Sequence, residues 1–114
     1  MINSEISNPA DQLKILPCGG GRSAIVYLGY PLYLSRDEFR LLSVLLRTAP
    51  IDADPEGYLS SETILTALQE LGTSLSTSRI VLLTSRINRK ASVIGGRKLI
   101  QGKSHHGYRI NPRL

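Results

Sequence analysis

The sequence predicts an α+β fold in which short antiparallel strands come first, three helices follow and a β-hairpin comes last. Two observations lead to this prediction. Up to residue 34 the apolar residues form short runs rich in β-branched and aromatic side chains, a composition typical of strands. From residue 35 they recur at the spacing of amphipathic helices. The chain has 114 residues, 41% of them hydrophobic, which is enough to bury one core.

The N-terminal part is expected to hold a tail and a small sheet. Residues 1–12 are polar and lack periodicity, so we predict a flexible tail ahead of a single domain over residues 13–114. Gly and Pro residues separate the apolar runs that follow. The predicted strands are residues 13–16, 24–28 and 32–34, and the predicted turns are residues 17–21 and 29–31.

The first helix begins at a recognisable cap. Ser35 and Glu38 have the spacing of a capping box, in which each side chain accepts a hydrogen bond from the other residue's backbone amide. Pro50 is expected to end this helix, which leaves residues 50–57 as an acidic loop. The predicted apolar face is formed by Phe39, Leu42, Leu45 and Leu46.

Two more helices follow, each with its own capping residue. Ser60 or Ser61 is expected to cap the second helix, which Gly72 ends. The third is predicted to start at one of residues 76–78 and to run to about residue 91. The predicted core positions are Ile64, Leu65, Leu68 and Leu71 in the second helix, and Ile80, Leu83 or Thr84, and Ile87 in the third.

A basic hairpin is predicted at the end of the domain, with strands at residues 97–101 and 107–110 and a turn at 102–106. Three helices followed by such a hairpin have the plan of a winged helix-turn-helix domain. A helix about 10 Å across fits the major groove of B-DNA, which is about 12 Å wide. A hairpin beside it reaches the neighbouring groove or backbone.

The charges are divided unevenly along the chain. Residues 1–70 contain five Lys or Arg against all nine acids, a net charge of −4, whereas residues 71–114 contain nine Lys or Arg and no acid, a net charge of +9. A segment with only positive charges is typical of a surface that binds a polyanion. The division therefore favours nucleic-acid binding by the third helix and the hairpin.

In this arrangement the sequence resembles the OmpR/PhoB-type effector domain of two-component response regulators, over residues 13–112. The segment YPLYLSRDEFRLLSVLL is similar to that family's strand and first helix, and YLSSETILTAL to the start of its second helix. SRINRK followed by LIQGKSHHGYRI resembles the end of its recognition helix and its wing, which usually closes in Gly-Tyr-Arg. The resemblance implies sequence-specific binding of double-stranded DNA and transcription regulation.

The resemblance also implies a set of DNA contacts. Helix 77–90 would lie in the major groove, and the wing at 102–107 would touch the adjacent groove or the backbone. Arg86 would read a base or clamp a phosphate. The implied contact residues are Ser78, Arg79, Leu82, Ser85, Arg86, Arg89, Lys90, Lys103, Ser104, His105, His106, Tyr108 and Arg109.

Several positions depart from the family pattern. Ser78, Leu83, Ser85 and Asn88 stand where the family usually has Arg, His or other DNA-facing polar residues, and His105 stands where it has Gly. Gly102 and Ser104 replace its usual wing Thr and Arg. The family's receiver domain is absent, so the chain is either a fragment of a longer regulator or a stand-alone module. The acidic loop at residues 50–57 is longer than the family's usual turn between the first two helices.

Two other readings stay open, and both keep the same fold. The domain could serve as a protein-interaction module that has lost base readout and uses Leu82 and Leu83 as outward side chains. RNA binding is the weaker reading, because the chain has only five Tyr and one Phe and no aromatic stacking platform. The open protein partners are RNA polymerase, another regulator, and a second copy of the chain as a homodimer.

Other function classes are not supported by the sequence. Residues 19–23 (GGGRS) precede a strand rather than a helix, so they are read as a turn and not as a phosphate-binding loop. No catalytic triad or carboxylate pair is visible, and no cofactor or metal is expected, since Cys18 is the single cysteine. No apolar run is long enough for a membrane span. The N-terminus lacks a signal pattern, so a cytoplasmic protein is expected.

Overall fold

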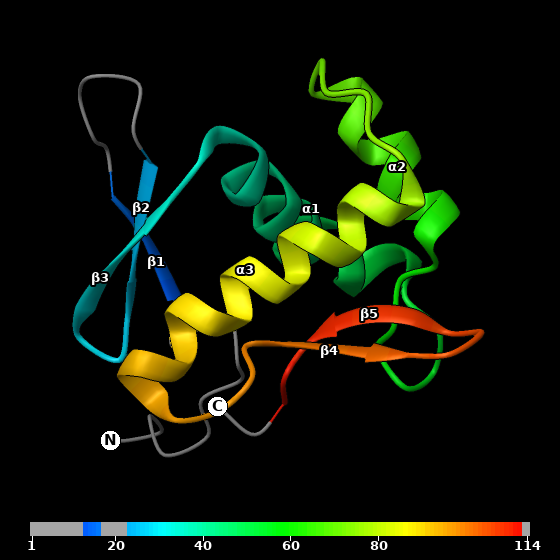
Figure 1. Ribbon diagram of the computed structural model, residues 1–114. Coiled ribbons are helices and arrows are strands. Elements are labelled where there is room, and N and C mark those ends of the chain that lie inside the picture. Colours follow the sequence, from blue (N-terminus) through cyan, green and yellow to red (C-terminus); the bar gives the residue numbers. More distant parts are fainter. Residues whose placement is uncertain (1–12, 17–22, 113–114) are drawn as a thin grey trace.

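The structure is a computed structural model that describes residues 13–16 and 23–112. The predicted tail at residues 1–12 and the predicted turn at 17–21, with Cys18, lie outside the described residues. The described part has the predicted α+β order of three strands, three helices and a hairpin (Figure 1).

The first three strands form one antiparallel sheet in the order β1-β2-β3, with β1 at Leu13–Leu16, β2 at Ser23–Tyr27 and β3 at Tyr30–Leu34. The β2–β3 turn is formed by Leu28 and Gly29, which both have positive φ values, 53° and 83°. Two such residues make the tight turn that suits a hairpin. The turn is therefore shorter than predicted, and Pro31 lies in β3, opposite Val26. A proline is tolerated there because β3 is an edge strand.

The three helices begin at their predicted caps. In the capping box, the Ser35 amide lies 2.9 Å from Glu38 Oε1 and the Glu38 amide lies 3.2 Å from Ser35 Oγ. Ser60 caps the second helix and Ser76 the third. The helices are α1 at Arg36–Asp52, α2 at Ser61–Glu70 and α3 at Thr77–Gly95.

Two predicted helix ends were wrong. Helix α1 continues past Pro50 to Asp52, so the loop before α2 is shorter than residues 50–57. A proline in the last turn removes one backbone donor without blocking the residues before it. Helix α3 continues past Ala91 to Gly95 and ends at Gly96, whose φ of 69° is the left-handed C-cap conformation.

The core lies between the sheet and the three helices. The face of α3 that packs into it consists of Ile80, Leu83, Thr84, Ile87 and Ala91. Leu83 is fully buried, so its predicted role as an outward side chain was wrong. The core spacing of the helix places Leu83 and Thr84 inside together, and this leaves Leu82 outside.

The hairpin consists of β4 at Ile100–Lys103 and β5 at Gly107–Ile110, paired antiparallel. It begins later than predicted for residues 97–101. Leu59, just before α2, bridges to Tyr108, and the amide of each residue donates to the other's carbonyl, at 2.8 and 2.9 Å. This bridge attaches the hairpin to the segment before α2. The hairpin also runs along one side of α3 (Figure 1), and the layout is that of a winged helix. Among the described residues no helix is long and apolar enough to cross a membrane.

Candidate nucleic-acid interface

The outward face of α3 is basic and contains no acid. Ser76 caps the helix by accepting from the Arg79 amide at 3.2 Å, and the core residues then turn the opposite side of the helix to solvent. The exposed side chains on this face are Ser78, Val81, Leu82, Ser85, Arg86, Arg89 and Lys90, with Arg79 half-buried beside them. Most of the predicted contact residues of the helix therefore reach solvent.

Arg86 and Arg89 carry the available charge of this face. The guanidinium group of neither residue forms an ion pair or a hydrogen bond with the described part of the chain. Arg79 forms no ion pair with a described carboxylate either. Three guanidinium groups on one helix are thus left without a carboxylate partner within the described residues.

Lys90 has a role inside the fold. Its Nζ lies 2.6 Å from Glu38 Oε1 and 3.1 Å from the carbonyl oxygen of Tyr33. The Glu38 side chain is only 3% exposed, whereas that of Lys90 is 41% exposed. Lys90 therefore compensates the buried carboxylate of the capping box, and its positive charge is paired within the fold. The sequence gives no sign of this pairing, because the two residues are 52 positions apart in the chain.

Asn88 also turns inward. Its side-chain amide donates to the Ile100 carbonyl at 2.9 Å, and its Oδ1 accepts from the Ile100 amide at 2.8 Å. Asn88 stands where the resembling family usually has a DNA-facing polar residue, but here its side chain binds the backbone of Ile100. Asn88 instead satisfies both backbone groups at the start of β4, and so joins α3 to the hairpin.

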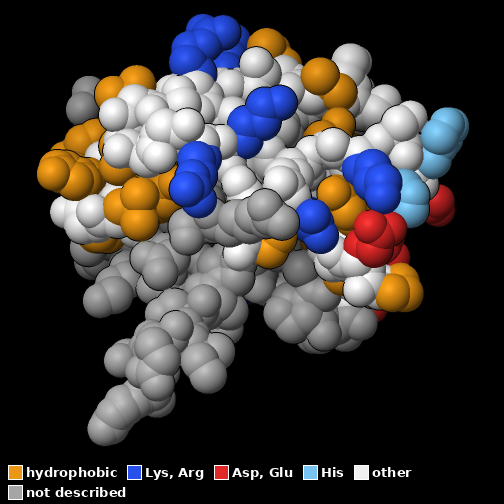
Figure 2. All heavy atoms as spheres, turned by 90° about the horizontal axis from the view of Figure 1, so that it is seen from below, with side chains coloured by type: hydrophobic (Ala, Val, Ile, Leu, Met, Phe, Trp, Pro, Cys, Tyr) orange, Lys and Arg blue, Asp and Glu red, His pale blue; other side chains and the backbone are white. Residues whose placement is uncertain are grey.

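The hairpin tip meets the acidic loop that precedes α2. Lys103 Nζ lies 3.2 Å from Glu56 Oε2, and His106 Nδ1 lies 3.2 Å from Asp54 Oδ2. Figure 2 shows the two pale blue histidines beside blue cations and red carboxylates at one end of the molecule, and red appears in that view only there. Lys103 and His106 therefore have carboxylate neighbours within the fold.

Arg109 is also held within the fold. Its Nε donates to Gln101 Oε1 at 2.8 Å, and its Nη1 donates to the Glu56 carbonyl oxygen at 2.5 Å. Its guanidinium lies over the ring of Tyr58, 4.4 Å from the centroid, and Lys103 lies 5.9 Å from the same centroid. Such cation–π contacts hold long basic side chains in place.

Asp54 organises the acidic loop. Its Oδ1 accepts from the amides of Glu56 and Tyr58, both at 2.9 Å. The hydrogen bond from the Tyr58 amide, with smaller effects from His106 and the Glu56 amide, holds the pKa of Asp54 below its usual value. An Asp followed by Pro, Glu and Gly is a turn signal in the sequence, but the sequence gives no sign that the turn packs against the hairpin.

The remaining predicted wing residues differ in accessibility. Ser104 and His105 are exposed at the tip, and His105 has a φ of 66°. This is the position where the resembling family has Gly. Tyr108 is half-buried and its backbone pairs with Leu59, so its main contribution is to the attachment of the hairpin.

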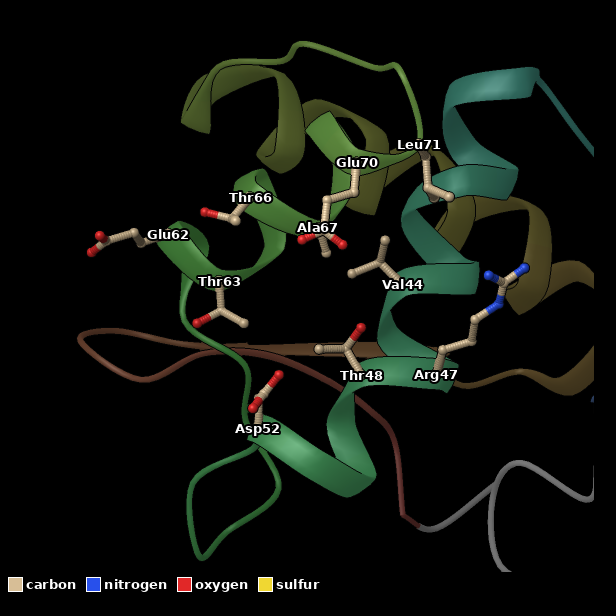
Figure 3. Close-up of a pocket in the computed structure, with 10 residues that line it drawn as sticks. All are labelled: Val44, Arg47, Thr48, Asp52, Glu62, Thr63, Thr66, Ala67, Glu70 and Leu71. Atoms are coloured by element: carbon tan, nitrogen blue, oxygen red, sulfur yellow. The ribbon is translucent and has the colours of Figure 1, made fainter.

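Several hollows open on the described surface. One, of about 660 Å³, lies between α1 and α2, and Figure 3 shows its lining side chains, which come from these two helices and from Leu71 at the end of α2. A second, about 470 Å³, separates the start of α2 from the hairpin tip. A third, about 310 Å³, lies between α3 and β4 and includes Val81, Ser85 and Lys98 in its lining. The last two adjoin the basic surfaces described above.

No family model matches the chain, and no curated protein matches it. Within the described residues, no three His, Cys, Asp or Glu side chains form a group that could hold a metal ion.

Proposed function

We propose that the chain is a winged-helix DNA-binding domain of the OmpR/PhoB type that acts in transcription regulation. The observation that carries the proposal is the outward face of α3, where Arg86 and Arg89 are exposed and without partners in the described residues. A helix with this charge pattern, beside a hairpin, fits the groove and backbone of duplex DNA.

The contact set follows from accessibility. We assign base and phosphate contacts on α3 to Ser78, Arg79, Ser85, Arg86 and Arg89. Lys90 is assigned to the fold, because Glu38 and Tyr33 hold its ammonium group. Lys103, Ser104 and His105 are the residues of the hairpin tip best placed to meet the adjacent backbone, and a cytoplasmic location is proposed because the protein needs access to DNA.

The test is a titration of duplex DNA at several salt concentrations, read by fluorescence anisotropy. If four to six phosphates are neutralised, log K falls with log salt at a slope of roughly −4 to −5. An affinity that does not change with salt concentration, or no binding to any duplex at low salt, would contradict the proposal. Arg86→Ala is expected to reduce sequence discrimination, and Arg89→Ala to weaken all sequences about equally.

A protein-interaction module remains the second candidate, and the exposure of Val81 and Leu82 favours it. Because Leu83 is buried, the exposed apolar pair is Val81 and Leu82 instead of the predicted Leu82 and Leu83. Sedimentation of the free chain separates the two candidates. A stable dimer that Leu82→Glu dissociates, together with no affinity for duplex DNA, would support the interaction module.

A further inference from the structure

The middle of the outward face of α3 is apolar. Val81 is 58% exposed and Leu82 is 40% exposed. Leu82 follows Ser78 by one helical turn and precedes Arg86 by one turn, so it lies in the same row as these polar residues. The helix therefore presents an exposed leucine between Arg79 and Arg86.

This apolar pair does not serve the core. The buried face of α3 is complete without it, since Ile80, Leu83, Thr84, Ile87 and Ala91 occupy the inward positions. An exposed leucine alone needs no explanation. Here, however, Arg79 and Arg86 lie about one turn before and after it, and Arg89 lies one turn further on, on a helix that has no acidic residue. The occupant of this face must offer negative charge at the rim and a small apolar group at the centre.

Duplex DNA offers this combination at one kind of base. In the major groove, thymine presents a C5-methyl group, the one apolar group on the base edges of unmodified DNA, between two rows of phosphates. An apolar protein surface would match Leu82 but would not supply the negative rim. The charge therefore decides between the two occupants in favour of DNA.

We propose that Leu82, with Val81 beside it, is a specificity-determining residue that selects thymine by contact with its C5-methyl group. This inference rests on the proposed DNA binding by α3. It adds the chemical group that is read, and it predicts binding sites with thymine opposite the middle of the helix.

The sharpest experiment changes the DNA rather than the protein. Duplexes that bind best are first selected from a random pool, and each thymine is then replaced by uracil, which lacks only the methyl group. At one or two positions the wild-type protein should bind the uracil duplex about fourfold more weakly, equivalent to about 0.8 kcal/mol at 1.4 kcal/mol per tenfold change. 5-Methylcytosine at the same position should bind more tightly than cytosine.

Protein variants then assign the effect to Leu82. Leu82→Ala should bind the thymine and uracil duplexes equally, which a double-mutant cycle measures as coupling between side chain and methyl. Val93→Ala is the matched control, because Val93 is 85% exposed on the same helix but three turns further on, and it should keep the wild-type preference. Alanine suits an exposed helical position, and thermal melting of both variants confirms that they fold.

Each result decides between distinct conclusions. Salt-dependent binding with equal affinity for thymine and uracil at every position would overturn this inference and leave the proposed function in place. A preference for thymine that Leu82→Ala retains would also overturn it. Failure to bind any duplex would overturn the proposed function itself, and dissociation of a dimer by Leu82→Ala would assign the apolar pair to a second copy of the chain.

Discussion

The outward face of α3 and the tip of the β4–β5 hairpin are both basic, but the fold treats their charges differently. On α3, Arg86 and Arg89 have no carboxylate partner within the described residues. At the hairpin tip, Lys103 pairs with Glu56, and the carboxylate of Asp54 lies beside His106. A phosphate that approaches α3 meets open cations, whereas one that approaches the tip must compete with carboxylates. Local charge counts therefore overstate what the hairpin offers to a polyanion.

The largest expected effect comes from detaching the hairpin. A Cβ on Gly107, whose φ is 117°, would lie 1.8 Å from the Leu59 carbonyl oxygen. Gly107→Ala should therefore destabilise the fold by about 2–4 kcal/mol in urea unfolding. Gly29→Ala is the control, because Gly29 also has a positive φ but no atom lies within 4 Å of its added Cβ. Equal losses in the two variants would show that backbone strain, and not the contact with Leu59, sets the cost.

The next effect tests the open charges on α3. Replacing Arg86 and Arg89 together by Ala should weaken duplex binding at low salt by about tenfold or more and make the salt slope less steep by about 2. Anisotropy titrations at several salt concentrations measure both quantities. The double change Lys103→Ala, His105→Ala should reduce the slope less. If the hairpin variant loses more of the slope, the contrast between the two surfaces is wrong.

Lys90 sharpens the contrast within α3 itself. Lys90→Met should lower the free energy of unfolding by about 1–2 kcal/mol, because Glu38 is buried and loses its cation, while the exposure of Lys90 reduces the effect. The salt slope for DNA should stay unchanged. Arg89→Ala should show the reverse, with normal stability and a smaller slope. A smaller slope for Lys90→Met would place Lys90 among the phosphate contacts.

A smaller effect, an increase in duplex affinity, is expected when the acidic loop loses a negative charge. Glu56→Gln removes the carboxylate next to Lys103 and keeps the side-chain shape, so duplex affinity at low salt should rise about two- to threefold. Exposed ion pairs contribute little to stability, so thermal unfolding should change little. Glu62→Gln is the matched control, because Glu62 lines the hollow between α1 and α2, and it should leave DNA affinity unchanged. No gain for Glu56→Gln would show that the hairpin carries no DNA contact.

The smallest effect is the pH dependence of Asp54. Its pKa is lowered in the folded state, so the stabilisation it gives is fully present above its unfolded pKa of about 4 and is lost as the pH falls through the folded value. Melting temperatures of the wild type and Asp54→Asn should differ at pH 6 and converge as the pH falls below 4. A constant difference between the two proteins would contradict this origin of the stabilisation.

The parts of the fold that could be predicted are those with local signals. Ser35, Ser60 and Ser76 cap the three helices within three residues of the amides that they bind, so a short stretch of sequence is enough to find them. Strand β1 was also predicted with its observed bounds. The end of α1 was predicted wrongly. A proline destabilises the interior of a helix but is tolerated in its last turn, and the sequence alone does not show in which of these places Pro50 lies.

The candidate site was harder to predict because its main contacts join distant segments. Lys90 with Glu38, Asn88 with Ile100, and His106 with Asp54 each connect residues from different elements. The residue types gave no sign of these pairings. The assignment of Leu83 also depended on a rotation of the helix by one residue, which apolar spacing left open between Leu83 and Thr84. The basic character of the region was predictable, but the division into paired and open cations required the fold.

The two hydrogen bonds between Asn88 and Ile100 have a mechanical consequence. They tie the first residue of β4 directly to α3, so we expect the helix and the hairpin to keep one relative position when they meet DNA. A duplex that contacts both α3 and the hairpin must therefore present its major groove and the neighbouring backbone at a fixed rotation about the DNA axis. Inserting one base pair between the two contacted segments would rotate one of them away by about a tenth of a turn, and the hairpin could not follow.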